Sequence, residues 1–500
     1  MHFAKILSVA TLPMFLFACG DDSATIRPPS STETPTDTSK VEIPPNTPDS
    51  LLTPIAREYS WNGKGTKEEP YQISSEDELA MLAFYVNDSS MTFKNTYFIQ
   101  TADIALSKSW NPIGLWGKNA DGLGNRPFSG SYDGGSKMIS GLTIADTAAY
   151  SGLFGLTRDA SISNVVLKSV KMTVGSYAGA LVGKSESTTI DNCSVEDAEV
   201  KGADWVGGLV GEASHVNVAN VSVTGVVNGE NFVGGVVGRL QDGAFENLSN
   251  KADVTGKNTV GGVAGNFASS VKSGSSATDS EGVIRNVLNY GSVTGKSYVG
   301  GVVAKLSSTK LEHSGNYGVV TADSVQMSCV GGVVAEASNK SSINEVFNTA
   351  AVSAKFAISI GGVIGSLKNS SATNLFNQGA VTGFSSSKGV GGLAGIVDGG
   401  ESKLESGYNA GKLSSELYVG AVVGKVSATK DVSNVYFNAT VDAGCEPFAE
   451  SMFSSENLPK GMATEEMKAA TFVTTLNGAN AVWTIDPAKF NGYPVFSWLN

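Results

Sequence analysis

The sequence predicts an all-β protein built as a parallel β-helix, a solenoid in which short strands stack coil upon coil. Three observations predict it: one phrase returns every 27 to 39 residues, asparagines recur at fixed places in the repeats, and the composition favours strands. Of the 500 residues only 16% are charged, while glycine occurs 59 times. Low charge with many glycines and β-branched residues fits stacked short strands better than helices or disorder. A repeat of this period indicates units that bury their apolar faces only against their neighbours.

Residues 1–19 read as a lipoprotein signal peptide. Lys5 precedes the apolar run from Ile6 to Phe17, which is too short to span a bilayer and right for the core of a secretory signal. The run ends in Leu16-Phe17-Ala18-Cys19, which resembles the lipobox of bacterial lipoproteins. That resemblance implies a lipid anchor on Cys19 and a place at the outer membrane or cell surface of a Gram-negative bacterium. The alternative is an ordinary signal peptide that ends near a cysteine.

Residues 20–58 are rich in Pro, Ser, Thr and Asp, including Pro28-Pro29 and Pro44-Pro45. Such a composition cannot build a core, so we expect a disordered tether that spaces the body from the membrane. The pair Asp21-Asp22 behind Cys19 resembles the acidic export signals of some surface lipoproteins.

Residues 59–145 are expected to form an N-terminal cap and the first coils. Ser75 and Glu78 have the spacing of a capping box, and apolar residues at helical spacing follow as far as Asn87. A short amphipathic helix ahead of a strand array would cover the open end of the core. Strand-like segments follow at Tyr97–Ile99, Asp103–Leu106 and Lys137–Ile139.

Residues 146–445 carry the repeat. The phrase reads VGGLVG from Val206, and later copies begin at Val233, Val260, Val299, Val330, Ile360, Val390 and Val419, with weaker ones at Tyr150 and Ala178. We expect three strand segments per repeat: the phrase, a segment such as Ile284–Val287, and a segment such as Val293–Gly295. Ten right-handed coils with adjacent strands about 4.8 Å apart would give a core about 48 Å long.

Two columns of asparagine support the stacking. One contains Asn164, Asn192, Asn220, Asn247, Asn286, Asn374 and Asn434, and the other contains Asn250, Asn289, Asn316, Asn348, Asn377 and Asn409. Asparagine tolerates left-handed corners, and its amide can bond to the copies above and below it. We interpret both columns as structural; the alternative is a row of sugar-binding amides.

Residues 446–500 are expected to form a C-terminal cap. A helix is predicted from Thr464 through Leu476 and stopped by Asn477-Gly478, and an aromatic tail from Tyr493 to Trp498 follows it.

The repeat phrase resembles the GLUG motif of bacterial surface proteins, which is associated with β-helical stalks. Gly63–Thr66, Pro70–Ile73, Trp110–Gly114 and Asn491–Val495 are similar to the segments that flank such repeats. The resemblance covers roughly residues 59–500 and bears on architecture more than on function. GLUG motifs also occur beside immunoglobulin-cleaving metalloproteases, but the sequence has no H-E-x-x-H, and its histidines are only His2, His215 and His313.

Several classes of partner are excluded. A net charge of −12 argues against nucleic acid. Three histidines supply no metal site, and we expect no cofactor. Cys193, Cys329 and Cys445 fall in different repeats, so no disulfide framework is expected.

We predict no catalytic residues. The residue after the phrase alternates in charge, as in Lys184, Glu212 and Arg239 and then Lys305 and Glu336, which fits register-fixing ion pairs. A glycosidase would need two convergent carboxylates, and no such pair stands out.

The candidate ligand-binding residues are Tyr177, Trp205 and Phe232, which precede the phrase in three successive repeats, with Tyr298 and Tyr418 further along. If exposed, their rings form a strip on which sugar rings or a protein could pack; the alternative is that they fill a corner of the core. The repeat near Ser269–Glu281 is about twelve residues longer than the one before it. The extra residues form either a loop that recognises a ligand or a solvent-exposed loop without a function of its own.

The leading hypothesis is a lipid-anchored surface protein for adhesion or for binding of glycan or protein ligands. The alternative is a passive stalk, and a polysaccharide-degrading enzyme is third.

Overall fold

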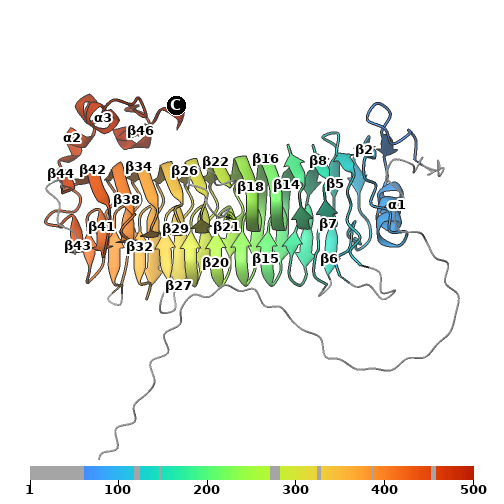
Figure 1. Cartoon of the computed structure of the whole chain (residues 1–500), viewed down its shortest axis with the longest axis horizontal. Coiled ribbons are helices and arrows are strands. Elements are labelled where there is room, and N and C mark those ends of the chain that lie inside the picture. Colours follow the sequence, from blue (N-terminus) through green and yellow to red (C-terminus); the bar gives the residue numbers. More distant parts are fainter. Residues whose placement is uncertain are drawn as a thin grey trace, which may run out of the picture. The chain divides into compact units, whose positions relative to one another are not determined.

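The computed structural model describes residues 61–117, 124–145, 148–270, 282–323, 328–384, 387–451 and 458–499. They form an all-β parallel solenoid of about 13 turns with 7% helix, so the predicted fold class is confirmed (Figure 1). The prediction of about ten coils was too low because it counted only copies of the phrase. The region before them also winds, and its strands pair in parallel. The predicted signal peptide with Cys19 and the predicted tether lie outside the described residues.

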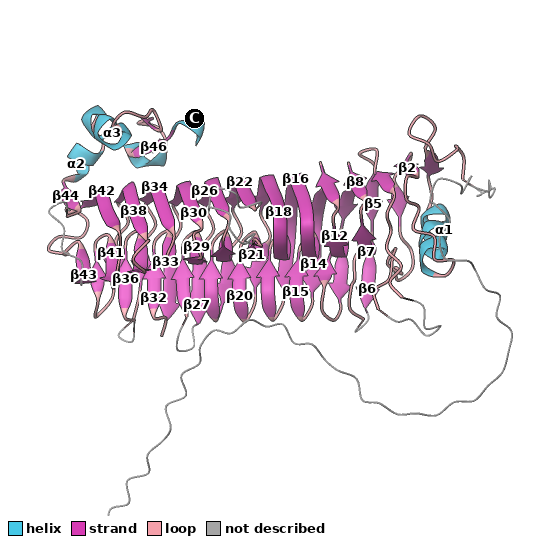
Figure 2. Ribbon diagram, in the orientation of Figure 1, coloured by secondary structure: helices cyan, strands magenta, loops and turns pink. Residues whose placement is uncertain are grey.

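The N-terminal helix α1 (Glu76–Asn87) covers one end of the solenoid, as Figure 2 shows. Ser75 Oγ accepts a hydrogen bond from the Glu78 N–H, and the Glu78 carboxylate accepts one from the Ser74 N–H. Leu79, Leu82 and Val86 are buried, so the predicted helix and its apolar face are confirmed. The first strands are β1 Tyr71–Ile73, β2 Tyr97–Gln100, β3 Ile104–Ala105, β4 Ser131–Asp133, β5 Met138–Ser140, β6 Thr143–Ala145, β7 Phe154–Arg158, β8 Ser161–Ser163, β9 Val166–Lys168, β10 Lys171–Thr173, β13 Thr189–Asp191 and β14 Ser194–Lys201.

The repeat phrase is a corner and not one strand, which corrects the expectation of three segments per coil. In each copy the first valine and glycine end one strand, the next two residues bend, and the last two begin another strand. The strands before the bend form their own sheet: β11 Ala178–Gly179, β15 Asp204–Gly207, β17 Asn231–Gly234, β20 Asn258–Gly261, β24 Ser297–Gly300, β28 Cys329–Gly331, β32 Ser359–Gly361, β36 Gly389–Gly391 and β40 Val419–Gly420.

The strands after the bend belong to the long 35-stranded sheet. They are β12 Val182–Glu186, β16 Val210–Asn228, β18 Val237–Asn250, β21 Ala264–Ala268, β25 Val303–Ser307, β29 Val334–Ser338, β33 Ile364–Lys368, β37 Ala394–Asp398 and β41 Val423–Val426.

Two further strands complete each regular coil, and they match the other two predicted segments. The first set is β22 Val283–Asn289, β26 Lys310–Asn316, β30 Ser342–Asn348, β34 Ser371–Asn377, β38 Lys403–Asn409 and β42 Asp431–Asn438. The second set is β19 Asp253–Thr255, β23 Val293–Gly295, β27 Val320–Asp323, β31 Val352–Lys355, β35 Val381–Thr382 and β39 Leu413–Ser414.

In the middle copies of the phrase, from Gly235 to Gly392, the second glycine is required for space. A Cβ on Gly235 would lie 2.2 Å from the carbonyl oxygen of Gly262 on the next coil and 2.4 Å from the Asn250 side chain. Real Cβ atoms do not approach other atoms so closely, so a larger residue there would push the corner off its neighbour. Copies nearer the two ends have Ala180 and Ala421 at this position.

Both asparagine columns are ladders, as expected. In the inner column Asn289 is fully buried, and its amide donates to Asn316 Oδ1 at 2.8 Å and to the Gly291 carbonyl at 2.8 Å. Asn316, Asn348 and Asn377 repeat this pattern. In the outer column the asparagines have left-handed backbone, as at Asn220 and Asn247, whose side chains are joined by a 3.0 Å hydrogen bond.

The last elements fold back along the side of the solenoid, which an end cap alone does not describe. After β43 (Phe448–Ser451) and β44 (Lys460–Met462) come α2 (Thr464–Met467), α3 (Ala470–Asn477), the antiparallel pair β45 (Trp483–Ile485) and β46 (Pro494–Phe496), and the short turns Phe490–Gly492 and Ser497–Leu499. We call residues 463–499 the C-terminal segment. It packs on Phe347, Phe376, Tyr408 and Tyr436 of four successive coils.

The single helix predicted for Thr464–Leu476 is broken at Lys468 and Ala469. Met467 and Phe472 are both buried against the solenoid. In one continuous helix, residues five apart would point in different directions. The break lets both side chains reach the aromatic residues beneath them.

Candidate functional site

Tyr177, Trp205 and Phe232 lie in one column, on successive coils at β11, β15 and β17. Their rings are stacked: the centroids of Tyr177 and Trp205 are 4.5 Å apart at 14°, and those of Trp205 and Phe232 are 6.0 Å apart at 4°. Tyr150 continues the stack, 4.3 Å from Tyr177, and Trp116 follows 5.5 Å from Tyr150. The aromatic column is thus longer than predicted.

The rings of the aromatic column are half-buried, so they are neither core nor fully open. Because the rings stack on one another, their faces are largely occupied and their edges form most of the accessible surface. The Trp205 indole nitrogen is buried and has no hydrogen-bond acceptor within reach among the described residues. A ligand at this column would therefore meet ring edges, which carry the positive part of the ring quadrupole.

The backbone of the aromatic column is left-handed. The φ angles are 64° at Tyr150, 61° at Tyr177, 55° at Trp205 and 54° at Phe232. This conformation costs a residue other than glycine about 1–2 kcal/mol. At another left-handed position of the same coils the chain uses Asn192, Asn220 and Asn247, which tolerate it. The chain thus has aromatic residues at positions where asparagine would have a lower conformational cost.

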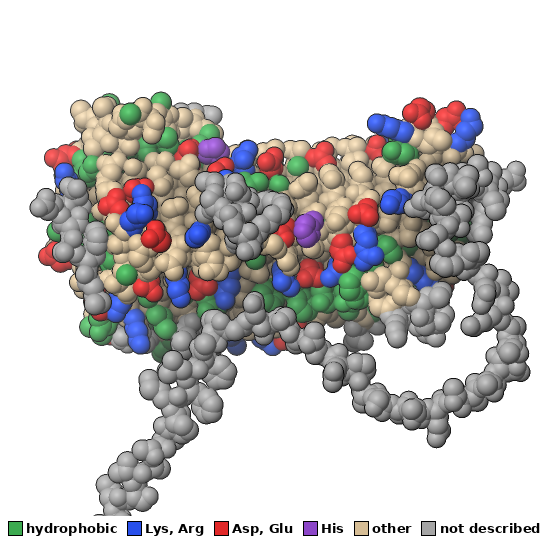
Figure 3. Space-filling view, viewed as in Figure 1, with side chains coloured by type: hydrophobic (Ala, Val, Ile, Leu, Met, Phe, Trp, Pro, Cys, Tyr) green, Lys and Arg blue, Asp and Glu red, His purple; other side chains and the backbone are tan. Residues whose placement is uncertain are grey.

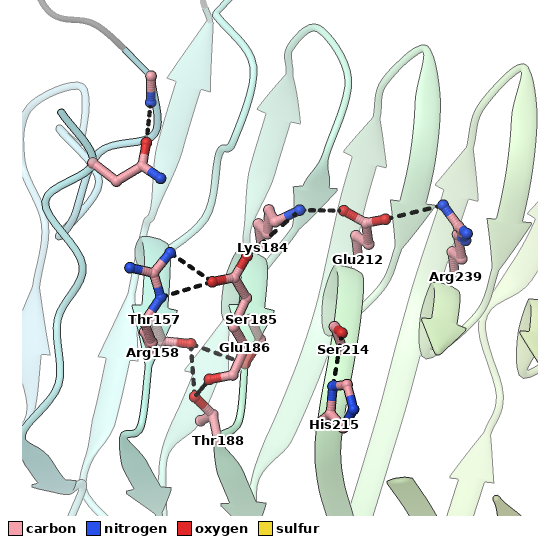
Figure 4. A network of polar contacts seen from close by, with 12 residues as sticks. Thr157, Arg158, Lys184, Ser185, Glu186, Thr188, Glu212, Ser214, His215 and Arg239 are labelled. Atoms are coloured by element: carbon pink, nitrogen blue, oxygen red, sulfur yellow. Dashed lines mark hydrogen bonds and ion pairs between the residues drawn. The ribbon is translucent and has the colours of Figure 1, made fainter. Parts of the chain in front are cut away.

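A row of alternating charges, Lys184, Glu212 and Arg239, crosses three successive coils (Figure 4), and Lys184 Nζ lies 5.7 Å from the centroid of the Tyr177 ring. Lys184 Nζ is 2.8 Å from Glu212 Oε2, and Arg239 Nη1 is 3.3 Å from Glu212 Oε1. Lys184 Nζ also lies 4.3 Å from the centroid of the Trp116 ring. The predicted charge alternation is therefore real here, and the charges are already matched by one another.

Tyr298 and Tyr418 occupy the same corner on later coils but are separated from the column. Thr259 follows Phe232 in the register and is buried, which ends the run of rings. Lys305 Nζ lies 3.6 Å from the centroid of the Tyr298 ring, and Tyr418 is 47% exposed. Residues 271–281 of the long excursion lie outside the described residues.

The sequence reasoning missed a second set of stacked rings on the outer face. The Phe347 ring is 5.0 Å from Phe376 at 11°, and Phe376 is 5.5 Å from Tyr408 at 5°. The signal was an aromatic residue directly before the buried asparagine in three successive repeats. The C-terminal segment covers these rings, and Tyr408 Oη donates to the Pro494 carbonyl at 2.5 Å.

His215 lies between Ser214 and Asp242, an arrangement with the residue types of a hydrolase triad. Ser214 Oγ is 3.1 Å from His215 Nδ1, but His215 Nε2 is 3.6 Å from Asp242 Oδ2, beyond a hydrogen bond. Burial alone would raise the pKa of Asp242, but hydrogen bonds from Ser270 and Ser269 and the nearby His215 outweigh it and lower that pKa. Asp242 therefore holds the start of the long excursion and does not orient His215.

The buried thiols and the paired carboxylates of the solenoid are also placed in surroundings that do not favour catalysis. Burial raises the pKa of the Cys193 and Cys329 thiols to about 12, so both stay protonated and unreactive.

Glu186 and Glu212 lie on either side of Lys184, whose Nζ is 3.8 Å from Glu186 Oε1. The ammonium occupies the gap in which a glycosidase would need its substrate.

Within the described ranges, no cluster of three or more His, Cys, Asp or Glu side chains could hold a metal ion. No helix in the same ranges is long and apolar enough to span a membrane.

Comparison with known proteins gives limited similarity. No family model matches the chain. Halomucin of Haloquadratum walsbyi is 34% identical over 144 residues, which is 25% of this chain and 1% of halomucin. The chain thus corresponds to about one hundredth of that relative's length. A crystal structure of a proposed immunoglobulin A1 protease from Bacteroides ovatus aligns over 87% of this chain and 94% of its own with 15% identity and a TM-score of 0.28. A TM-score this low gives no common arrangement from which a role can be transferred.

Proposed function

We propose that this chain is a surface-displayed β-solenoid that binds extracellular glycan or protein ligands and is held at the outer membrane by a lipid on Cys19. The observation that carries the binding role is the aromatic column from Tyr150 to Phe232. Four half-exposed rings stand at left-handed corners where they cost conformational energy. Strain retained at a surface position is typical of sites kept for recognition.

The membrane location rests on the lipobox-like sequence that ends in Cys19 and on the Pro-rich stretch behind it. A long tether would hold the aromatic column on the side of the solenoid at a distance from the membrane, where it could reach an extracellular ligand. Replacement of Cys19 by Ser should move the chain from the membrane fraction to the soluble fraction. An unchanged fractionation of Cys19→Ser would contradict the anchor.

The binding role is tested on a glycan and extracellular-matrix array with the purified chain. Wild type and Trp205→Asn are compared, because asparagine suits the left-handed corner and removes only the ring. A ligand captured by wild type and lost in Trp205→Asn supports the proposal. Equal signals from the two proteins would contradict it.

The second candidate is a passive stalk. One observation favours it: ring faces in the aromatic column stack on each other, and Lys184 and Arg239 are both paired with Glu212. A stalk predicts that Trp205→Asn changes stability alone. The enzyme hypothesis has no comparable support, because Lys184 fills the gap between Glu186 and Glu212.

A further inference from the structure

The C-terminal segment leaves the coils before β26 open on the outer face. Trp498 packs near His313, with ring centroids 5.6 Å apart, and Phe490 lies 6.4 Å from Tyr317, so the segment reaches the coil of β26. In the space-filling view the segment is a raised block beside a lower side of the solenoid (Figure 3). The next coil carries Asn286, Leu288 and Tyr290, which we call the Tyr290 surface.

Tyr290 presents a ring that is both exposed and fixed. Its side chain is 44% exposed, and its ring stacks on Tyr317 with centroids 4.9 Å apart at 4°. Tyr317 is held in turn by an edge contact with Phe347, 5.2 Å away. The Tyr290 N–H donates to the Asn250 carbonyl at 2.8 Å, which ties the corner to the inner asparagine ladder. A ring positioned before a ligand arrives loses little freedom on binding.

The other face of the Tyr290 ring differs from those in the aromatic column. The coil above it has Lys251 at the matching position, and Lys251 Nζ lies 5.9 Å from the ring centroid. That distance is at the outer limit of a cation–π contact and holds the lysine only weakly. In the described part of the chain Lys251 has no carboxylate within ion-pair distance. A flexible cation thus stands over an aromatic face that a ligand can reach.

We propose that the Tyr290 surface binds a carboxylate-bearing pyranose at the end of an acidic glycan. The apolar face of the sugar ring stacks on Tyr290, and its carboxylate pairs with Lys251. Leu288 packs against the aromatic cluster that the C-terminal segment shares with the outer face, and the segment itself reaches Tyr317 on the next coil, so it would stop a glycan chain there. The inference rests on the ligand-binding role proposed above but uses residues outside the aromatic column.

The test is calorimetric titration of the purified chain with oligogalacturonate and with sialyllactose, and with cellohexaose as a neutral probe. The two acidic probes distinguish a uronate from a sialate source of the same chemistry. We expect Tyr290→Ala to weaken acidic binding about tenfold and Tyr290→Phe to preserve it. Lys251→Gln should weaken acidic binding about tenfold and leave any neutral binding unchanged.

Matched controls separate this site from others. Tyr418→Ala removes an equally exposed tyrosine and should leave acidic binding intact. Trp205→Asn should also leave it intact; if Trp205→Asn abolishes acidic binding while Tyr290→Ala does not, the aromatic column is the site and this inference is overturned. Absence of acidic binding by wild type overturns it as well, and the array then decides the wider proposal separately. A melting temperature within two degrees of wild type shows that each variant is folded.

Discussion

At the scale of single residues, the left-handed corners show two solutions to one steric problem. The outer asparagines accept a positive φ because a short amide can bond locally. At Trp205, stacking on Tyr177 and Phe232 offsets the strain. Aromatic stacking contributes about 0.5–1.5 kcal/mol beyond area burial, which is close to the conformational cost.

That near balance makes Trp205→Asn a sharp stability test. Asparagine relieves the strain while losing the stacking, so we expect the free energy of unfolding to change by no more than about 1 kcal/mol. Trp205→Val loses the stacking and places a β-branched residue at positive φ, so it should be destabilised by about 2–3 kcal/mol. Urea unfolding followed by circular dichroism measures both. Equal losses in the two variants would mean that backbone strain plays no part.

The lowered pKa of Asp242 predicts that the free energy of unfolding depends on pH. Its pKa is lowered in the folded protein, so the stability it supplies is complete above the unfolded pKa of about 3.9 and disappears as the pH falls through the folded pKa. Asp242→Asn leaves the Ser270 N–H facing an amide and should cost about 1–3 kcal/mol at neutral pH.

The deficit of Asp242→Asn should shrink as the pH falls below about 4, where wild type loses the same contribution. Thermal melts of both proteins from pH 7 to pH 2 measure the gap. Glu246→Gln, at a more exposed ion pair, is the control and should show a small gap throughout. A constant gap for Asp242→Asn across the acid range would contradict the role given to Asp242.

At the scale of elements, the inner asparagine ladder fixes each coil on the next. Asn316 Nδ2 donates to Asn348 Oδ1 and to the Gly318 carbonyl, and Asn316 Oδ1 accepts from Asn289 and from the Gly318 N–H. Asn316→Ala leaves these buried groups without partners, so we expect a loss of about 3 kcal/mol. Hydrogen exchange at the neighbouring amides should locate the loss in this coil. Asn286→Ala, in the exposed ladder, should cost about 1 kcal/mol because water replaces its bonds.

The local signals of the sequence predicted most of these elements. Ser75 and Glu78 placed α1, and the spacing of the phrase placed like residues over like, as Val206, Val233 and Val260 show. The phrase could not be recognised as a corner, because that depends on the contact between Gly235 and Asn250, which only the folded coil creates. The column of Tyr177, Trp205 and Phe232 followed from register alone. That its ring faces are occupied depends on side-chain rotamers, which no spacing reveals.

At the scale of the whole described unit, the C-terminal segment could not be placed from the sequence because its contacts are distant. Tyr408 bonds to Pro494 across 86 residues, and the Trp483 indole N–H donates to Asn374 across 109. The earlier coils have Ser222 and Ser249 at the position that Phe347, Phe376 and Tyr408 occupy later. At this register position, therefore, the aromatic side chains named above occur only on coils that the segment covers.

Removal of the C-terminal segment should convert the solenoid into a self-associating protein. A chain that stops at Met462 exposes Phe347, Phe376, Tyr408 and Tyr436 as one continuous strip. Apolar patches of this kind drive association in water. We expect the truncated chain to elute as dimers or larger species in size-exclusion chromatography with light scattering, and the full chain to elute at a smaller mass at the same concentration.

The early coils supply the control for this truncation. Phe347→Ser, Phe376→Ser and Tyr408→Ser together give the later coils the surface that Ser222 and Ser249 give the earlier ones. In the truncated chain these three substitutions should restore the smaller mass, because a serine surface is wetted without penalty. If the truncated chain keeps the mass of the full chain without them, the strip is not adhesive and the segment serves another purpose. If the substitutions leave the aggregates in place, the lost segment supported the coils themselves, and its role is to stabilise the solenoid.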